Sequence, residues 1–248
     1  MLAALPSADF ERLRPDLEPV ALPLGLVVRE AGSHVHYAYF PVTGIVSLEQ
    51  ELANGATAEV ALTGNDGMLG LALIAGGGTT TTRAFVRAEG IGYRLRADRL
   101  RKEFERSRAL REILLRYAQL LFTQVAQTIA CRRHHSVEQQ VCKVLLSTID
   151  RSGSEDLALT QGLIAELVGA RRESVTAVAG ALQMAGVIRY HRGRITVLDR
   201  PALAGRACEC HAAIKREALR LFAQPFAAPA RPTIAPRHAQ SDFALAAD

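Results

Sequence analysis

A single uninterrupted segment separates two kinds of sequence in this chain. The residues from Arg108 to His134 include neither glycine nor proline, the two residues that most often end a helix. Along the segment, apolar and polar side chains recur at alternating steps of three and four, at Leu110, Ile113, Tyr117, Leu120, Gln124, Gln127 and Cys131. This spacing is typical of a coiled-coil seam. We therefore predict a dimerisation helix over residues 108–135 with these seven side chains in the dimer interface. The alternative is a buried helix of a monomer.

A second stripe predicts that this helix also contacts its own domain. It consists of Leu114, Leu121, Val125 and Ile129 and lies beside the first stripe.

The residues before the helix have the pattern of short β-strands. Between Pro19 and Leu95, brief runs rich in β-branched and aromatic residues alternate with turn-forming residues. The pair Asn54-Gly55 is a strong signal for a tight hairpin. Short strands at regular spacing favour a small antiparallel roll over a parallel sheet. Residues 1–107 are therefore predicted to form an antiparallel β-roll, and the whole chain is predicted to be of the α+β class.

The composition of the 248 residues, 49% hydrophobic and 22% charged, is that of a globular protein. No run reaches the roughly 18 apolar residues of a membrane span, and the first residues lack the pattern of a secretion signal. We therefore expect a cytoplasmic protein without a membrane partner. The net charge of +5 is modest, but all except three of the 30 basic residues are arginine, which binds phosphate in a bidentate manner. A polyanionic partner is thus permitted.

The four cysteines are expected to be reduced thiols. Cys131, Cys142, Cys208 and Cys210 show neither the spacing of a disulfide framework nor a Cys-x-x-Cys zinc motif. Residues so close together as Cys208, Cys210 and His211 would point in different directions on one helix, so a single metal ion could not bind all three. We expect no metal site and assign packing roles to Cys131 and Cys210.

Residues 160–182 have the pattern of two short helices joined by a tight turn. Ala165 is small enough for a helix crossing, and Gly169 follows where the turn requires a left-handed backbone. Thr160 is a good cap for the first helix. The second helix is expected to begin near Arg171 or Arg172 and to expose its first turns.

A basic hairpin is predicted directly after these helices, where two β-rich runs within residues 187–197 meet at Gly193. Residues 168–200 contain six arginines against one glutamate and one aspartate, a net charge of +4 in 33 residues. Arginine, glutamate and threonine can read base edges, so the segment predicts binding to duplex DNA. The alternative is a helical bundle with a solvated arginine face. The predicted DNA-binding residues are Thr160, Gln161, Arg171, Arg172, Glu173, Ser174, Thr176, Arg189, Arg192 and Arg194.

The DNA-binding domain is predicted to cover residues 136–222, with residues 201–222 as one additional helix that starts at Pro201. Residues 223–248 are rich in proline and alanine and are predicted to be a disordered tail.

The order of these parts resembles the Crp/Fnr family of bacterial transcription regulators over about residues 19–199, most specifically over residues 159–195. In that family, a β-roll binds an effector or houses a sensor, and a long helix at the dimer axis transmits the response to a winged helix-turn-helix. The resemblance implies a homodimer that binds a palindromic operator in double-stranded DNA and regulates transcription. The resemblance implies a protein that is not an enzyme, with RNA polymerase as a candidate partner. Arg172-Glu173 matches the family's base-reading pair, whereas Ala177 stands where a further arginine is frequent.

The roll departs from the pattern of cyclic-nucleotide-binding members. In Gly67-Met68-Leu69-Gly70, methionine occupies the place of the glutamate that binds the ribose. Those members also have an arginine followed by serine or threonine that binds the phosphate. In Thr82-Arg83 the arginine comes one residue later, which on a strand places its side chain on the opposite face unless a shift of the loop returns it to the pocket. We therefore predict a degenerate effector pocket at Met68, Leu69, Thr82 and Arg83. Its ligand, if it has one, is an unidentified small molecule rather than cyclic AMP.

Other chemistries remain as alternatives. The absence of any cysteine before Cys131 argues against the family's iron–sulfur cluster. His34 and His36 are candidate haem or metal ligands, although histidines beside a turn are also common on protein surfaces. A cupin-like small-molecule- or metal-binding protein is the competing function class, and its available ligands are His34, His36, Glu49, Glu51, Glu59 and Asp66. A protein–protein adaptor derived from a regulator is the third alternative.

Overall fold

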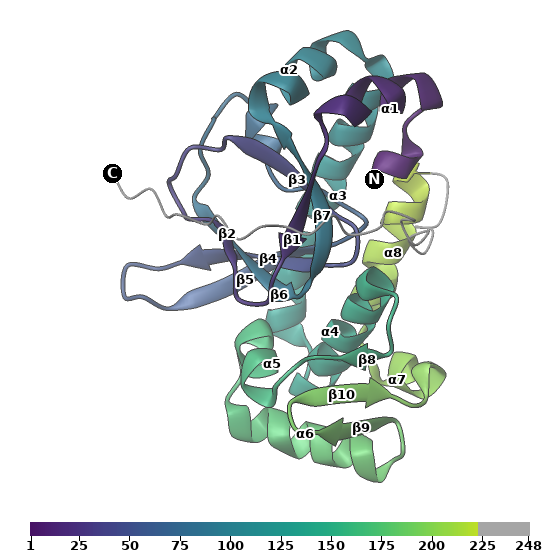
Figure 1. Ribbon diagram of the computed structural model, residues 1–248. Helices are drawn as coiled ribbons and strands as arrows, with labels where there is room; N and C mark the ends of the chain where they lie inside the picture. The colour runs from purple at the N-terminus through teal and green to yellow at the C-terminus, as the bar shows by residue number, and fades with distance from the viewer. Residues whose placement is uncertain (223–248) are drawn as a thin grey trace.

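The computed structural model describes residues 1–222, so the predicted tail at residues 223–248 lies outside the described residues. Figure 1 shows the β-sheets at one end of the molecule, a smaller domain of helices and a short hairpin at the other, and one long helix between them. The helices are α1 (Ser7–Leu13), α2 (Ala97–Arg106), α3 (Arg108–His134), α4 (Val137–Ser152), α5 (Gln161–Val168), α6 (Arg172–Met184), α7 (Arg200–Arg206) and α8 (Glu209–Phe222). Short 3-10 turns cover Leu2–Ala4, Arg14–Asp16 and Leu71–Leu73.

The strands of the N-terminal domain are β1 (Glu18–Leu22), β2 (Val27–Arg29), β3 (Tyr37–Pro41), β4 (Ile45–Glu51), β5 (Thr57–Thr63), β6 (Thr82–Ala88) and β7 (Gly90–Arg96). They form two antiparallel sheets, in the orders β1-β7-β3 and β2-β6-β4-β5. The predicted hairpin joins β4 to β5, and Gly55 in its turn has a φ of +80°. The predicted antiparallel β-roll is thus confirmed. No helix within residues 1–222 is both long and apolar enough to cross a membrane.

The long helix forms as predicted, but the residues predicted to form the dimer seam face the core of their own chain. Ser107 caps α3 by accepting a hydrogen bond from the Leu110 backbone N–H at 3.0 Å. Six of the seven predicted interface residues are buried within this single chain, namely Leu110, Ile113, Tyr117, Leu120, Gln124 and Cys131, and Gln127 is half-buried. They pack against the roll, the adjacent helices and α8, so a second chain cannot reach the six buried ones. The spacing alone does not distinguish a seam against a partner from a seam against the chain's own core.

A different stripe of α3 is exposed. Leu115, Phe122 and Ile129 are 55%, 69% and 67% exposed, and they follow one another at steps of seven. Ile129 was predicted to lie in the stripe that contacts its own domain, and this prediction is also wrong, because its side chain is exposed. A repeat of seven places these three side chains along one face of the helix.

The C-terminal domain has its own core around α4. Ser136 and Gln139 form a reciprocal capping box at the start of α4. Strands β8 (Asp156–Leu157), β9 (Ile188–His191) and β10 (Arg194–Val197) form a sheet in the order β8-β10-β9. The core residues that join these elements include Val141, Leu145, Ile164, Val175, Leu182, Ile195 and Leu203.

The predicted helix over residues 201–222 is two helices. The chain leaves the helical conformation at Ala207, where ψ is 155°, and α8 begins at Glu209. Helix α7 remains in the core of the C-terminal domain, whereas α8 lies along α3. Ala218 and Ile214 of α8 join the core cluster that contains Tyr117 of α3 and residues of the roll. The last helix therefore packs against α3 and the core of the roll, rather than only against the DNA-binding domain predicted for residues 136–222.

Polar contacts, one of them buried, connect the two ends of the molecule in addition to the covalent chain. Arg151 of α4 forms an ion pair with Asp66 of the roll at 3.0 Å, and the two side chains are only 9% and 8% exposed. The Arg151 guanidinium also donates a hydrogen bond to Gln124 Oε1 of α3 at 3.2 Å. Arg87 of β6 reaches Glu166 of α5 at 3.5 Å. These contacts hold the C-terminal domain against the roll.

Candidate nucleic-acid interface

The turn between α5 and α6 has the predicted geometry. Gly169 ends α5 with φ +68° and ψ +36°, a left-handed conformation that a residue with a side chain adopts only at a cost. Thr160 Oγ1 accepts a hydrogen bond from the Leu163 backbone N–H at 3.1 Å and so caps α5. Ala165 and Val175 are buried where the two helices pack together. The predicted helix-turn-helix, with α6 starting at Arg172, is confirmed.

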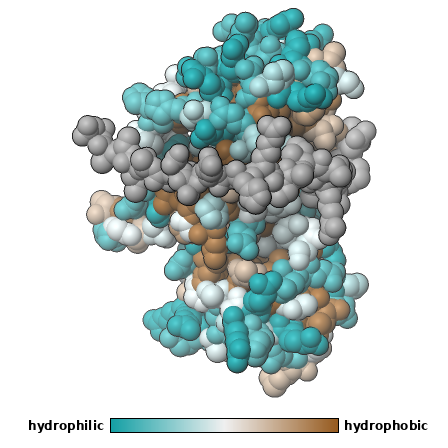
Figure 2. Space-filling view, viewed as in Figure 1, coloured by the Kyte–Doolittle hydropathy of each residue, from teal (hydrophilic) through white to brown (hydrophobic). Residues whose placement is uncertain are grey.

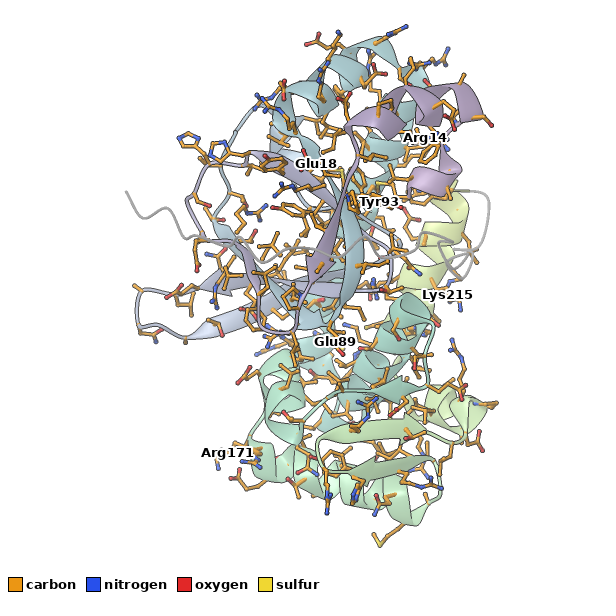
Figure 3. The ribbon with its side chains drawn as sticks, viewed as in Figure 1. Arg14, Glu18, Glu89, Tyr93, Arg171 and Lys215 are labelled. Carbon is orange, nitrogen blue, oxygen red and sulfur yellow. The ribbon has the colours of Figure 1, made fainter. Side chains whose placement is uncertain are left out.

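The first turns of α6 are open to solvent. Arg171, Arg172, Glu173 and Ser174 are all exposed, whereas Val175 points into the core. Figure 3 shows Arg171 pointing away from the body of the domain at the start of α6. Within the described part of the chain, no ion pair engages Arg171, Arg172 or Glu173. These side chains are therefore available to an external partner.

Thr176 and Gln161 connect the two helices on this open face. Thr176 is exposed, and its Oγ1 lies 2.7 Å from Gln161 Oε1 and 3.0 Å from the Arg172 backbone oxygen. Gln161 is half-buried. Of the predicted DNA contacts, these two are already hydrogen-bonded to each other, which holds α5 and α6 in a fixed relation.

The hairpin places further arginines beside the start of α5. Strands β9 and β10 are joined by a two-residue turn of Arg192 and Gly193, with φ of +46° and +79°. A positive φ at a residue other than glycine costs of order 1 kcal/mol, so the tight turn holds Arg192 in an unusual conformation at the tip. A methyl group added at Gly193 would lie 3.3 Å from the Thr160 methyl carbon. The tip thus lies next to the cap of α5.

The wing arginines differ in how they are engaged. Arg189 and Arg192 are exposed, and no ion pair among residues 1–222 includes either. Arg194 forms an ion pair with Asp156 of β8 at 2.7 Å, which raises the pKa of Arg194 and lowers that of Asp156. The face formed by α6 and the hairpin is therefore basic, and the surface of this domain in Figure 2 is mainly hydrophilic. We name the exposed residues of α6 and the hairpin (Arg171, Arg172, Glu173, Ser174, Thr176, Arg189 and Arg192) the basic face.

The four residues of the predicted effector pocket do not line one pocket. Met68 and Leu69 are both buried, and they belong to different core clusters. A methyl group added at Gly67 would overlap the Tyr117 hydroxyl, so α3 closes directly over this turn. Met68 fills core space because its side chain, unlike that of a glutamate, can be buried without a polar partner. The prediction of a shared pocket at Met68, Leu69, Thr82 and Arg83 is therefore wrong.

Arg83 is engaged by carboxylates instead. It lies on the face of β6 opposite to the buried Ala84, 3.2 Å from Glu30 and 3.9 Å from Glu49. Thr82 is half-buried, and its backbone oxygen and Oγ1 accept hydrogen bonds from Arg29. Arg83 is thus neutralised by two acidic side chains in this arrangement.

A different hollow occurs in the roll. A cavity of about 380 Å³ is lined by Arg29, His34, His36, Tyr37, Tyr39 and Leu69, among others. Nε of Arg29 is buried there without a hydrogen-bond partner within residues 1–222. Of the six candidate ligands of a cupin-like metal site, His34 and His36 line this cavity, but the four carboxylates do not; Glu49 pairs with Arg87 and Asp66 with Arg151.

Glu59 of β5 lines a smaller cavity, of about 40 Å³, at the junction of the roll with α3, α4 and α5. Burial raises the pKa of Glu59 to about 7, against the opposing effects of a hydrogen bond from Ser47 Oγ at 2.6 Å and the positive charges of Arg87, Arg132 and Lys143. A carboxyl group between the two domains therefore changes charge near neutral pH.

The substitution Glu59→Gln is expected to remove a pH dependence of stability. The folded chain binds the Glu59 proton more tightly than the unfolded chain, whose glutamate has a pKa near 4.5. The stabilising effect is therefore complete below pH 4.5 and is lost as the pH rises through about 7. Near pH 8 the variant should be more stable than the wild type by up to about 3 kcal/mol, and near pH 5 by less than about 1 kcal/mol. Urea denaturation at both pH values tests this, and an equal shift at both would contradict it.

Comparison with known proteins agrees with this geometry. Residues 139–206 match the family model of the Crp-like helix-turn-helix domain. The chain is 28% identical over 209 residues to a CRP-like cAMP-activated global transcriptional regulator of Mycobacterium tuberculosis, across 82% of this chain and 93% of the relative.

Solved structures show the same fold. FixK2 from Bradyrhizobium japonicum has a TM-score of 0.67 at 16% identity, covering 77% of this chain and 98% of that one. TTHA1359, a CRP/FNR-family regulator from Thermus thermophilus, has a TM-score of 0.61 at 23% identity, covering 77% and 98%. The chain therefore contains a Crp-like helix-turn-helix domain, and over most of its length it is similar in sequence or in fold to transcription regulators of the Crp/Fnr family.

Proposed function

We propose that this chain is a homodimeric, cytoplasmic regulator that binds a specific DNA sequence through α6 and the β9–β10 hairpin and has no enzymatic activity. The observation that carries the proposal is the exposure of Arg172 and Glu173 directly after the helix-turn-helix turn, without ion-pair partners in residues 1–222. The residues at the N-terminal end of such a helix contact base edges in the major groove. The backbone N–H groups of this end favour a nearby phosphate.

The exposed stripe of α3 supports the dimer. Leu115, Phe122 and Ile129 form an apolar row with a heptad spacing, and large apolar side chains in such a row are usually covered by a partner. A second copy packed on this row would be related to the first by a two-fold axis. Two α6 helices would then contact half-sites of a palindromic operator about one helical turn, or roughly 34 Å, apart. RNA polymerase remains a predicted partner.

The substitution Arg172→Ala tests sequence reading. Duplexes are first selected from a random pool with the wild-type protein. We expect the variant to bind the selected duplex about 5- to 150-fold more weakly, equivalent to about 1–3 kcal/mol, and to lose preference for the base that Arg172 contacts. Fluorescence anisotropy measures the affinity for the selected duplex and for duplexes with a changed base at that position. The salt concentration is kept fixed, because salt alone changes the affinity for DNA.

The matched control is Arg14→Ala. Arg14 is an exposed arginine at the opposite end of the molecule from Arg171, as Figure 3 shows, so its loss should leave DNA affinity unchanged. An equal loss for Arg172→Ala on selected and random DNA would mean that Arg172 contacts only phosphate. A dimer that binds no duplex would instead support the adaptor alternative.

We also propose that the roll responds to a ligand other than cyclic AMP, or to none. Met68 is buried and offers no carboxylate to a ribose, and Arg83 already faces Glu30 and Glu49. Selection with and without cyclic AMP should therefore give the same operator at the same affinity. A tenfold gain with cyclic AMP would refute this part alone and leave the DNA-binding proposal intact.

A further inference from the structure

Four sulfur and nitrogen donors meet where α3 ends and α8 begins. Cys131 lies in the last turns of α3, and His135 is the residue that follows this helix. Cys208 lies in the link between α7 and α8, and Cys210 lies in the first turn of α8. The thiol sulfurs and the nearest imidazole nitrogen all lie within 4.8 Å of one another. We name these four residues the Cys3His cluster.

The spacing of the cluster matches a tetrahedral metal site. Cys131 Sγ and Cys208 Sγ are 3.6 Å apart, and Cys210 Sγ and His135 Nδ1 are also 3.6 Å apart. In a tetrahedral zinc site with Zn–S distances of about 2.3 Å, neighbouring sulfurs lie about 3.8 Å apart. Three cysteines with one histidine are a donor set of structural zinc sites. An iron–sulfur cluster fits less well, because its ligands bind different irons and must lie farther apart.

The surroundings of the cluster also fit a metal ion. The three cysteines are buried, and they form a cluster of their own rather than joining the three apolar cores. Glu209 lies 3.2 Å from His135 Nε2. If Nε2 carries the proton and donates it to this carboxylate, the Nδ1 lone pair faces the sulfurs. This is the arrangement by which a carboxylate usually orients a metal-binding histidine.

The spacing of the cysteines in the sequence does not reveal this cluster. Cys208, Cys210 and His211 were expected on one helix, where they would diverge. The helix instead starts after Cys208, and the other two donors come from the end of α3. Cys131 and Cys208, whose sulfurs lie 3.6 Å apart, are therefore 77 residues apart in sequence. His211 is directed elsewhere and lies 2.9 Å from Asp150.

We propose that Cys131, His135, Cys208 and Cys210 bind one zinc ion. The ion would tie the end of α3 to the start of α8, directly beside the junction at which α3 passes into the DNA-binding domain. Its role would be structural, since all four positions of the tetrahedron are protein ligands and none is left for a substrate. Lys143, which lines a cavity wall together with Cys131, would partly offset the negative charge of three thiolates.

Metal content of the full chain tests the proposal. Protein purified under reducing conditions is incubated with Zn²⁺, passed through a desalting column, and measured by native mass spectrometry and elemental analysis. We expect one zinc ion per chain. Cobalt in place of zinc should give the thiolate-to-metal absorption of a tetrahedral sulfur-rich site. Alkylation of the cysteines should be slow until a chelator removes the ion.

Three variants distinguish a zinc site from a group of packed, unligated thiols. Cys208→Ser is expected to lose the ion, whereas Cys142→Ser, which changes a buried cysteine outside the cluster, should retain it. Glu209→Gln changes an exposed residue that should not affect folding, and it should weaken zinc binding about 10- to 100-fold. This last variant keeps the test valid if Cys208→Ser fails to fold.

Three outcomes would overturn the proposal. The first is wild-type protein that contains no zinc and reacts rapidly at all its thiols. The second is stoichiometric zinc that Cys208→Ser retains. The third is a disulfide between Cys131 and Cys208 in protein kept under reducing conditions, which would make the close sulfur pair a redox pair rather than a ligand pair.

Discussion

Replacing Arg151 by leucine is expected to lower the free energy of unfolding by about 3–5 kcal/mol, because it leaves the Asp66 carboxylate buried without its partner. Arg151 is the centre of a network that joins three parts of the molecule. Its guanidinium contacts Asp66 of the roll, Gln124 of α3 and the Ser147 backbone oxygen of α4. Gly64 lies so close to this side chain that a methyl group there would be 2.8 Å from Arg151 Cβ.

Urea denaturation of the purified variant measures this loss. The control is Arg108→Leu, which breaks an exposed pair with Glu112 and should change stability by no more than about 0.5 kcal/mol. A double variant, Arg151→Leu with Asp66→Leu, should recover part of the loss, because an apolar pair of similar size can replace a buried ion pair. A loss below about 1 kcal/mol for Arg151→Leu would show that the two domains are not held together in solution by this contact.

The double substitution Phe122→Glu with Ile129→Glu is expected to convert a dimer into folded monomers. In the proposed dimer, Phe122 faces Phe122 of the second copy and Ile129 faces Ile129 of the second copy. The double substitution therefore replaces apolar contacts by pairs of like charges across the two-fold axis. Like charges at an interface cost several kcal/mol, which corresponds to a dissociation constant raised at least about 100-fold. Both residues are exposed in the single chain, so circular dichroism should show an unchanged fold.

Sedimentation velocity distinguishes monomer from dimer over a range of concentrations. Ile91→Glu on β7 is the control, because Ile91 is an exposed apolar residue that lies away from the α3 stripe. The monomeric variant should also bind a palindromic duplex far more weakly, since it no longer presents two α6 helices together. A variant that sediments as the wild type does would exclude this face of α3 as the interface.

The parts of the fold that rest on local signals were predictable. Thr160 as a cap and Gly169 as a turn residue act through their immediate neighbours, and both take their predicted roles. The hairpin at Asn54-Gly55 is local in the same sense. Local chemistry therefore gave the order of elements and the helix-turn-helix.

Features that depend on distant residues were not predictable in the same way. A stripe such as Leu110 and Tyr117 has the same spacing whether it packs on its own domain or on a partner, and only the position of the roll and α8 decides between these. Met68 and Arg83 were assigned to one pocket because their motif positions suggested it, but packing by Tyr117 and pairing with Glu30 separate them. The Cys3His cluster depends on α8 folding back along α3.

The return of α8 along α3 means that the DNA-binding domain is attached at two places. One connection is His135–Ser136, between α3 and α4, and the other is Ala207–Cys208, between α7 and α8. A domain attached through one flexible connection can rotate about any axis, whereas a domain attached through two can rotate only about the line that joins them. We therefore expect any reorientation of α6 that breaks the Arg151–Asp66 contact to follow a hinge axis through these two connections, beside Cys131.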